Sequence, residues 1–167
     1  MKTKSLIVLS IAVITFCNVA SAQHATKTDG AYINGLKVGD KYTKAQLINV
    51  LGEPQKIEKG TILNDFYILH YGTDSFFWVN GEFYGGELKS DKYSFCGTVK
   101  VGDSIAVIDK LFGISARYTD KDKPSDGYIL WQPNYPDKYE WEWLQVQFDY
   151  DKNGKIVRIS AIIPIFI

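Results

Sequence analysis

The sequence predicts an α+β fold of two tandem units, each a short helix followed by an antiparallel meander. The units are expected to form one open sheet with short helices on one face. The first observation behind this prediction is a recurring stretch. Gly35–Pro54 has the sequence GLKVGDKYTKAQLINVLGEP and returns in shorter form at Gly97–Gly113 as GTVKVGDSIAVIDKLFG.

The second observation is a distance that recurs within the chain. Gly52 and Gly113 each precede a stretch of the form D-x-Y-I-L by the same number of residues. Two landmarks with one spacing favour internal duplication, and chance similarity of short motifs is the alternative. We therefore expect a first α+β repeat over residues 35–95 and a second over residues 96–167.

Residues 1–22 have the pattern of a cleaved signal peptide. Lys2 and Lys4 give a positive start, Leu6–Phe16 is apolar, and Ala20–Ala22 is a small-residue cleavage site. The mature protein is then expected in the periplasm or outside the cell.

Cys17 is the only candidate for a lipid anchor, and no anchor is expected because the bulky Phe16 precedes it. Residues 23–34 are polar and small, without periodicity, and are interpreted as a flexible N-terminal segment. Cys96 is the one cysteine of the predicted mature chain, so no internal disulfide can form there.

Strong start and stop signals define the first helix. Thr43 and Gln46 form a capping box, and Gly52 followed by Pro54 ends the helix after about two turns. The second helix is predicted to begin after Asp103 or Ser104 and to end at Gly113. Its apolar stripe is formed by Ile105, Ile108, Leu111 and Phe112.

Two hairpins and one further strand are predicted. Asn80-Gly81 is a two-residue turn signal between Phe76–Val79 and Glu82–Tyr84. Asp151–Gly154 joins Leu144–Tyr150 to Lys155–Ile163. The further strand is Phe66–Tyr71, and Lys56–Asn64 before it is interpreted as a polar connection.

Alternation in the first strand of the second hairpin predicts an aromatic surface. If that strand continues back to Tyr139, then Tyr139, Trp141 and Trp143 share the face of the polar Gln145 and Gln147. A bulge between Glu142 and Leu144 would instead turn the tryptophans inward. The candidate partner-binding residues on the open face are Trp78, Trp131, Tyr139, Glu140, Trp141, Glu142 and Trp143.

Composition excludes several function classes. The 19 basic and 19 acidic residues balance, which disfavours nucleic acid and anionic membranes as partners. The apolar tail Ile159–Ile167 is too short to span a bilayer. The only histidines, His24 and His70, precede Ser104 of the Gly-Asp-Ser motif, so no nucleophile and base are paired in a known order.

Metal and cofactor sites are not expected either. Asp149–Gly154 matches the opening of a calcium-binding loop, but Ser160 stands where a bidentate glutamate is required. A hairpin turn is the better interpretation. Glu140 and Glu142 have no opposing carboxylate at an identifiable spacing, so no enzyme is predicted.

The stretch Gly35–Pro54 resembles the segment that opens the BamE/SmpA-type outer-membrane assembly lipoproteins. The residues that carry the resemblance are Gly39, Leu51, Gly52 and Pro54. Two such units in tandem are similar to the β-lactamase inhibitory protein architecture, and that resemblance implies a binding surface on the open sheet face. Neither β-lactamase inhibition nor barrel assembly follows from it.

The sequence thus leads to two functional expectations. The first is an exported, non-catalytic module that binds a protein partner, with an inhibitory or envelope-assembly role and envelope proteins as candidate partners. The alternative is a carbohydrate or small-ligand binder that uses the same aromatic residues.

Overall fold

The computed structural model describes residues 26–27, 30–61, 63, 65–112, 117–120, 125–131 and 144–163 of the 167-residue chain. The elements in chain order are β1 (Thr26–Lys27), β2 (Tyr32–Ile33), β3 (Leu36–Lys37), α1 (Lys44–Leu51), β4 (Lys56–Lys59), β5 (Phe66–Tyr71), β6 (Asp74–Val79), β7 (Glu82–Leu88), α2 (Ala106–Phe112), β8 (Arg117–Asp120), β9 (Ser125–Trp131), β10 (Leu144–Tyr150) and β11 (Ile156–Ile162).

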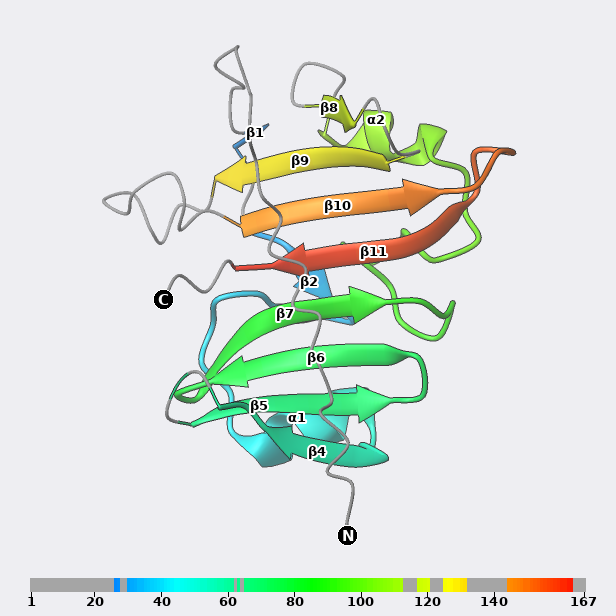
Figure 1. Ribbon diagram of the computed structural model, residues 1–167. Coiled ribbons are helices and arrows are strands. Elements are labelled where there is room, and N and C mark those ends of the chain that lie inside the picture. Colours follow the sequence, from blue (N-terminus) through cyan, green and yellow to red (C-terminus); the bar gives the residue numbers. More distant parts are fainter. Residues whose placement is uncertain are drawn as a thin grey trace, which may run out of the picture.

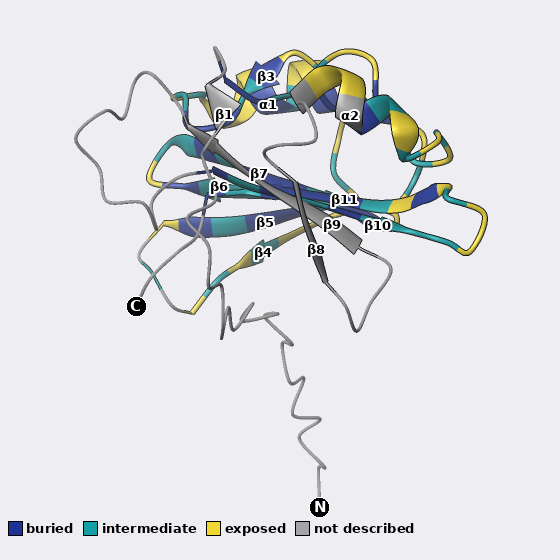
Figure 2. Ribbon diagram, turned by 90° about the horizontal axis from the view of Figure 1, so that it is seen from above, coloured by how far each residue is buried: buried dark blue, intermediate teal, exposed yellow. Residues whose placement is uncertain are grey.

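One sheet dominates the molecule. Its strand order is β1-β9-β10-β11-β7-β6-β5-β4, and β8 also pairs with β9 (Figure 1). All neighbours are antiparallel except β1 and β9, which are parallel. The helices α1 and α2 lie on the same side of the sheet (Figure 2). The other side is called the open face below.

The predicted fold class is wrong. The described chain is mostly strand, with helices of only 8 and 7 residues, and two tandem helix-plus-meander repeats are not found. Both β1 and β8 pair with β9, and the ribbon β2–β3 has no second copy in the described residues. The recurring glycines and hairpin signals are local turn features, which do not require a repeated tertiary unit.

Two segments that lacked a sequence signal are ordered. The polar connection predicted over residues 56–64 contains β4, whose four residues pair with β5 at the sheet edge. The segment expected to be flexible contains β2, and Ala31 and Ile33 within it are fully buried. Both are too short for a hydrophobic period to be recognised, although each pairs with the next strand in the chain.

The local predictions for α1 and the two hairpins are confirmed. Thr43 and Gln46 form both hydrogen bonds of the capping box, and Gly52 has a φ of 90° and donates to the Ile48 carbonyl. Asn80 and Gly81 both have positive φ between β6 and β7. In α2, Ile108 is buried but Leu111 is 42% exposed, so the apolar stripe of this helix is narrower than predicted.

Two tyrosine hydroxyls donate hydrogen bonds to carbonyl groups at the C-terminal end of α1. The Tyr71 hydroxyl donates to the Gly52 carbonyl at 3.0 Å, and the Tyr93 hydroxyl donates to the Leu51 carbonyl at 2.9 Å. Both rings are buried, and both pack edge-on against Phe76. These bonds satisfy carbonyls that an α-helix leaves without partners at its C-terminus.

Adjacent glycines in β7 allow close approach of neighbouring strands. A Cβ on Gly85 would lie 1.9 Å from the Ala161 carbonyl oxygen of β11. A Cβ on Gly86 would lie 2.4 Å from the Ser75 carbonyl oxygen of β6. The register slips between Phe77 and Trp78 at this point, which identifies a β-bulge.

Replacing Gly85 by alanine should destabilise the protein severely. Its φ of 97° strains any side chain, and the added methyl group meets a backbone oxygen. We expect a loss of about 3 kcal/mol or more in urea unfolding. Gly72→Ala is the matched control, because Gly72 also has positive φ but nothing lies within 4 Å of its added Cβ. It should cost about 1 kcal/mol, and equal losses would contradict the close approach.

Tyr71 should make the fold sensitive to alkali. Burial raises the pKa of Tyr71 from 10.0 to about 12. The folded state therefore retains a proton that the unfolded state loses, so this stability is complete below about pH 10 and is lost as the pH rises through about 12. Tyr71→Phe should flatten the stability profile between these values, measured by urea unfolding. An unchanged alkaline slope in the variant would contradict this assignment.

Candidate functional site: the open face of the sheet

Directly paired residues form a continuous polar row across the open face. The row consists of His70, Ser75, Glu87, Ser160 and Gln147, each paired with the next across adjacent strands. Paired residues of neighbouring strands share a face, so all five side chains belong to one side of the sheet.

The buried side is defined by alternation in β10. Leu144, Val146 and Phe148 are buried and belong to the same cluster as Leu47 of α1 and Ile108 of α2. Gln145, Gln147 and Asp149 alternate with them and are half-buried. The predicted polarity of this strand is therefore confirmed, and its polar side chains lie on the open face.

A second row beside the polar row is mixed. Phe77, Gly85, Ile162 and Gln145 pair in sequence across β6, β7, β11 and β10. Phe77 and Ile162 are both half-buried. The two rows together place apolar and hydrogen-bonding groups next to each other on the open face.

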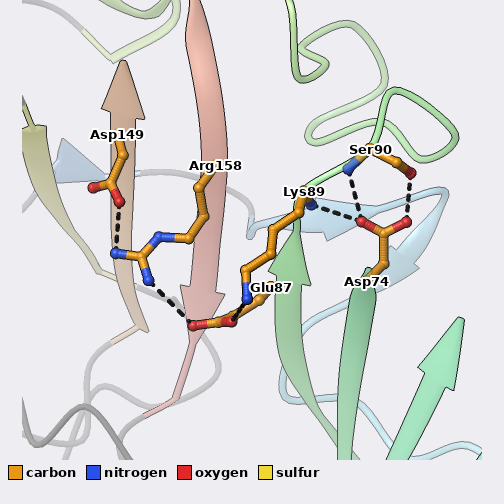
Figure 3. Close-up of polar contacts among 6 residues, drawn as sticks. All are labelled: Asp74, Glu87, Lys89, Ser90, Asp149 and Arg158. Atoms are coloured by element: carbon orange, nitrogen blue, oxygen red, sulfur yellow. Dashed lines mark hydrogen bonds and ion pairs between the residues drawn. The ribbon is translucent and has the colours of Figure 1, made fainter. Parts of the chain in front are cut away.

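Ion pairs connect three strands on this face. Arg158 of β11 lies 2.6 Å from Asp149 of β10 and 3.5 Å from Glu87 of β7, as Figure 3 shows. Glu87 also contacts Lys89 at 2.9 Å, and Gln147 donates to Asp149 at 2.9 Å. The network contains two cations and two carboxylates. It therefore places charges of both signs on the open face and has no net charge.

One end of the open face is apolar. Phe66, Ile68 and Val79 form a small buried cluster, separate from the main core. Leu63, Phe77 and Tyr84 pack against it. Phe77 thus belongs both to this cluster and to the mixed row.

Asp74 beside the network has a structural role. It is 1% exposed and accepts hydrogen bonds from the backbone N–H groups of Lys89 and Ser90 and from the Ser90 hydroxyl (Figure 3). These bonds fix the chain that leaves β7. A buried carboxylate with this many donors needs no ligand to explain it.

His70 lies near a carboxylate at the edge of the sheet. Its Nε2 atom is 3.6 Å from Glu58 and has no hydrogen bond within the described residues. The hydrogen bond from Lys56 lowers the pKa of Glu58 below its usual range. Over the described ranges, no cluster of three or more His, Cys, Asp or Glu side chains could hold a metal ion.

Trp78 does not lie where it was predicted. It is two residues from Phe76, so it shares the buried side, packs against the main core and pairs with the ring of Tyr67. Its indole N–H donates to the Tyr42 carbonyl at 3.0 Å. The sequence alone gave no means of deciding which parity of β6 faces the helices.

The other predicted residues are placed only in part. Trp131 ends β9 and pairs with Lys27 through the backbone. The remaining five lie outside the described residues, namely Tyr139, Glu140, Trp141, Glu142 and Trp143. Arg158, Glu87 and Asp149 were not predicted. Opposite charges at facing positions of the second hairpin were a usable signal for Asp149 and Arg158.

Among the helices that the structure describes, none is long and apolar enough to cross a membrane.

Removing the Arg158 guanidinium should lower the stability of the protein, because this group connects β7, β11 and β10. Arg158→Gln leaves Asp149 without a cation and Glu87 with Lys89 alone, and the side chains of Arg158, Glu87 and Asp149 are only 23% to 29% exposed. We expect a loss of about 1 kcal/mol in urea unfolding at low salt, and less at high salt. Lys56→Gln is the control, because this lysine is 63% exposed and should cost about 0.5 kcal/mol or less. Equal effects would show that the network adds nothing.

Comparison with known proteins assigns no family. No protein-family model matches the chain, and no curated protein matches it. One similar solved structure is the 1.5 Å crystal structure of an extracellular protein containing a SCP domain from Bacillus anthracis str. Ames. The identity is 12%, with a TM-score of 0.46, and the match covers 75% of this chain and 43% of that one. At this level the similarity identifies neither the family nor the function of the chain.

Proposed function

We propose that this protein is an exported, non-catalytic binding module that holds a protein partner on the open face of its sheet. The observation that carries the proposal is the composition of that face. Half-buried Phe77 and Ile162 lie in register with Gln145, next to the ion network of Arg158. Arginine and aromatic residues beside hydrogen-bonding groups are typical of protein interfaces.

The shape and charge of the face support a protein partner over the other classes. The five paired strands β5, β6, β7, β11 and β10 offer a broad surface, which suits another protein surface. The balanced charges of Arg158, Lys89, Glu87 and Asp149 provide no attraction for a polyanion. Such a pattern favours specificity of contact over rapid electrostatic steering.

Two parts of the proposal rest on sequence. Export follows from the signal-peptide pattern of residues 1–22, which places the partner in the periplasm or outside the cell. An inhibitory or envelope-assembly role is the second part, and it rests only on the similarity of Gly35–Pro54 to the assembly lipoproteins. Tyr139, Trp141 and Trp143 would extend the surface if the alternation of β10 continues toward them.

Site-specific photo-crosslinking tests the surface. A benzophenone amino acid at Gln147, on the open face, should give a discrete adduct in cells of the source organism. The same group at Asn49, exposed on α1, should not. Adducts of equal yield from both positions would contradict the proposal, because they would show that the open face is not selected.

Affinity of the purified pair provides the second readout. Arg158→Ala should weaken binding of the identified partner by about tenfold or more. Lys56→Ala, which removes a charge from the sheet edge, should leave the affinity within about twofold. An unchanged affinity in the Arg158 variant, at unchanged fold by circular dichroism, would exclude the network from the interface.

A further inference from the structure

A second surface feature lies at the end of the sheet where β6 turns into β7. A pocket of about 370 Å³ is lined by Asp65, Tyr67, Trp78, Asn80 and Gly81. The volume is near the lower end of the range of roughly 300–1,000 Å³ that small-molecule sites occupy. Tyr67 and Trp78 pack against the main core, so the pocket lies away from the open face.

Two neighbouring aromatic rings line the pocket. Tyr67 and Trp78 are directly paired across β5 and β6, with ring centroids 5.5 Å apart and planes tilted by 35°. The indole N–H of Trp78 is already bonded to the Tyr42 carbonyl, which holds this ring in place. The Lys59 ammonium lies over the Tyr67 ring, 5.9 Å from its centroid, so the π face that the pair can offer a ligand is chiefly that of Trp78.

The rim carries two exposed polar side chains. Asp65 and Asn80 are joined through the backbone, where the Asn80 N–H donates to the Asp65 carbonyl at 3.1 Å. Within the described residues, neither the carboxylate nor the amide has a side-chain hydrogen bond. Both residues have φ near 50°, a conformation that glycine would satisfy as well. The side chains add one carboxylate and one amide to what the turn requires.

We propose that this pocket binds a neutral saccharide ring. The C–H face of a sugar ring stacks on aromatic π faces, and neighbouring hydroxyls can be shared by a carboxylate acceptor and an amide that both donates and accepts. Asp65 opposes an anionic ligand at the rim. This site is separate from the proposed protein surface, so the failure of one proposal would not affect the other.

Nuclear magnetic resonance titration with cellobiose, maltose and N,N′-diacetylchitobiose tests the site. At least one of these sugars should shift the Trp78 indole N–H and the Gly81 amide saturably, with a dissociation constant of about 1 mM or below. Asp65→Gly and Asn80→Gly keep the backbone conformation and remove the polar groups. Each should weaken binding by about tenfold.

Ser75→Ala, on the opposite side of the sheet, is the matched control and should bind sugar as the wild type does. Trp78→Phe should also lose affinity, and its unfolding curve shows whether the fold is retained. Three results would overturn the proposal: no shift with any of the three sugars, shifts that persist unchanged in the glycine variants, or tighter binding of free indole than of the sugars. Capture of the protein partner by the Asp65→Gly variant should be unaffected.

Discussion

The pairing of β7 with β11 is the contact on which the rest of the structure depends. It joins the strands formed by the first part of the chain to those formed by the second, and it makes one sheet of them. The absence of a side chain at Gly85 lets the Ala161 carbonyl approach, and the absence of one at Gly86 does the same for Ser75. The pairing of β7 with β6 and with β11 therefore sets the strand register on both faces of the sheet.

Register determines which residues can act together. Because the side chains of a strand alternate, the pairing of four neighbouring strands brings Ser75, Glu87, Ser160 and Gln147 into a single row. The same pairing gives α1 and α2 a continuous apolar side to cover. A slip of one residue at β7 would exchange the polar row for core residues, so the core and the open face are fixed by one set of hydrogen bonds.

The two proposed binding sites lie on different sides of the sheet. The open face presents a broad, charge-balanced surface held by Arg158, whereas Tyr67 and Trp78 form a compact aromatic site at the sheet end. The ion network is half-buried and spans β7, β11 and β10, so its geometry depends on the pairing of β7 with β11. In the aromatic pair, the Trp78 indole N–H donates to the Tyr42 carbonyl, which is next to the capping box of α1.

Features that depend on neighbouring residues could be predicted from the sequence. The capping box of Thr43, the Asn80-Gly81 turn and the alternation of β10 are all present, because local hydrogen bonds and sterics specify them. Tertiary structure alone decided the strand order, the strand character of residues 56–59 and the side on which Trp78 lies. Strand order and the side on which Trp78 lies depend on segments distant in the chain, whereas residues 56–59 pair with the next strand but are too short to show a hydrophobic period. A period of two identifies two faces without saying which one the helices will bury.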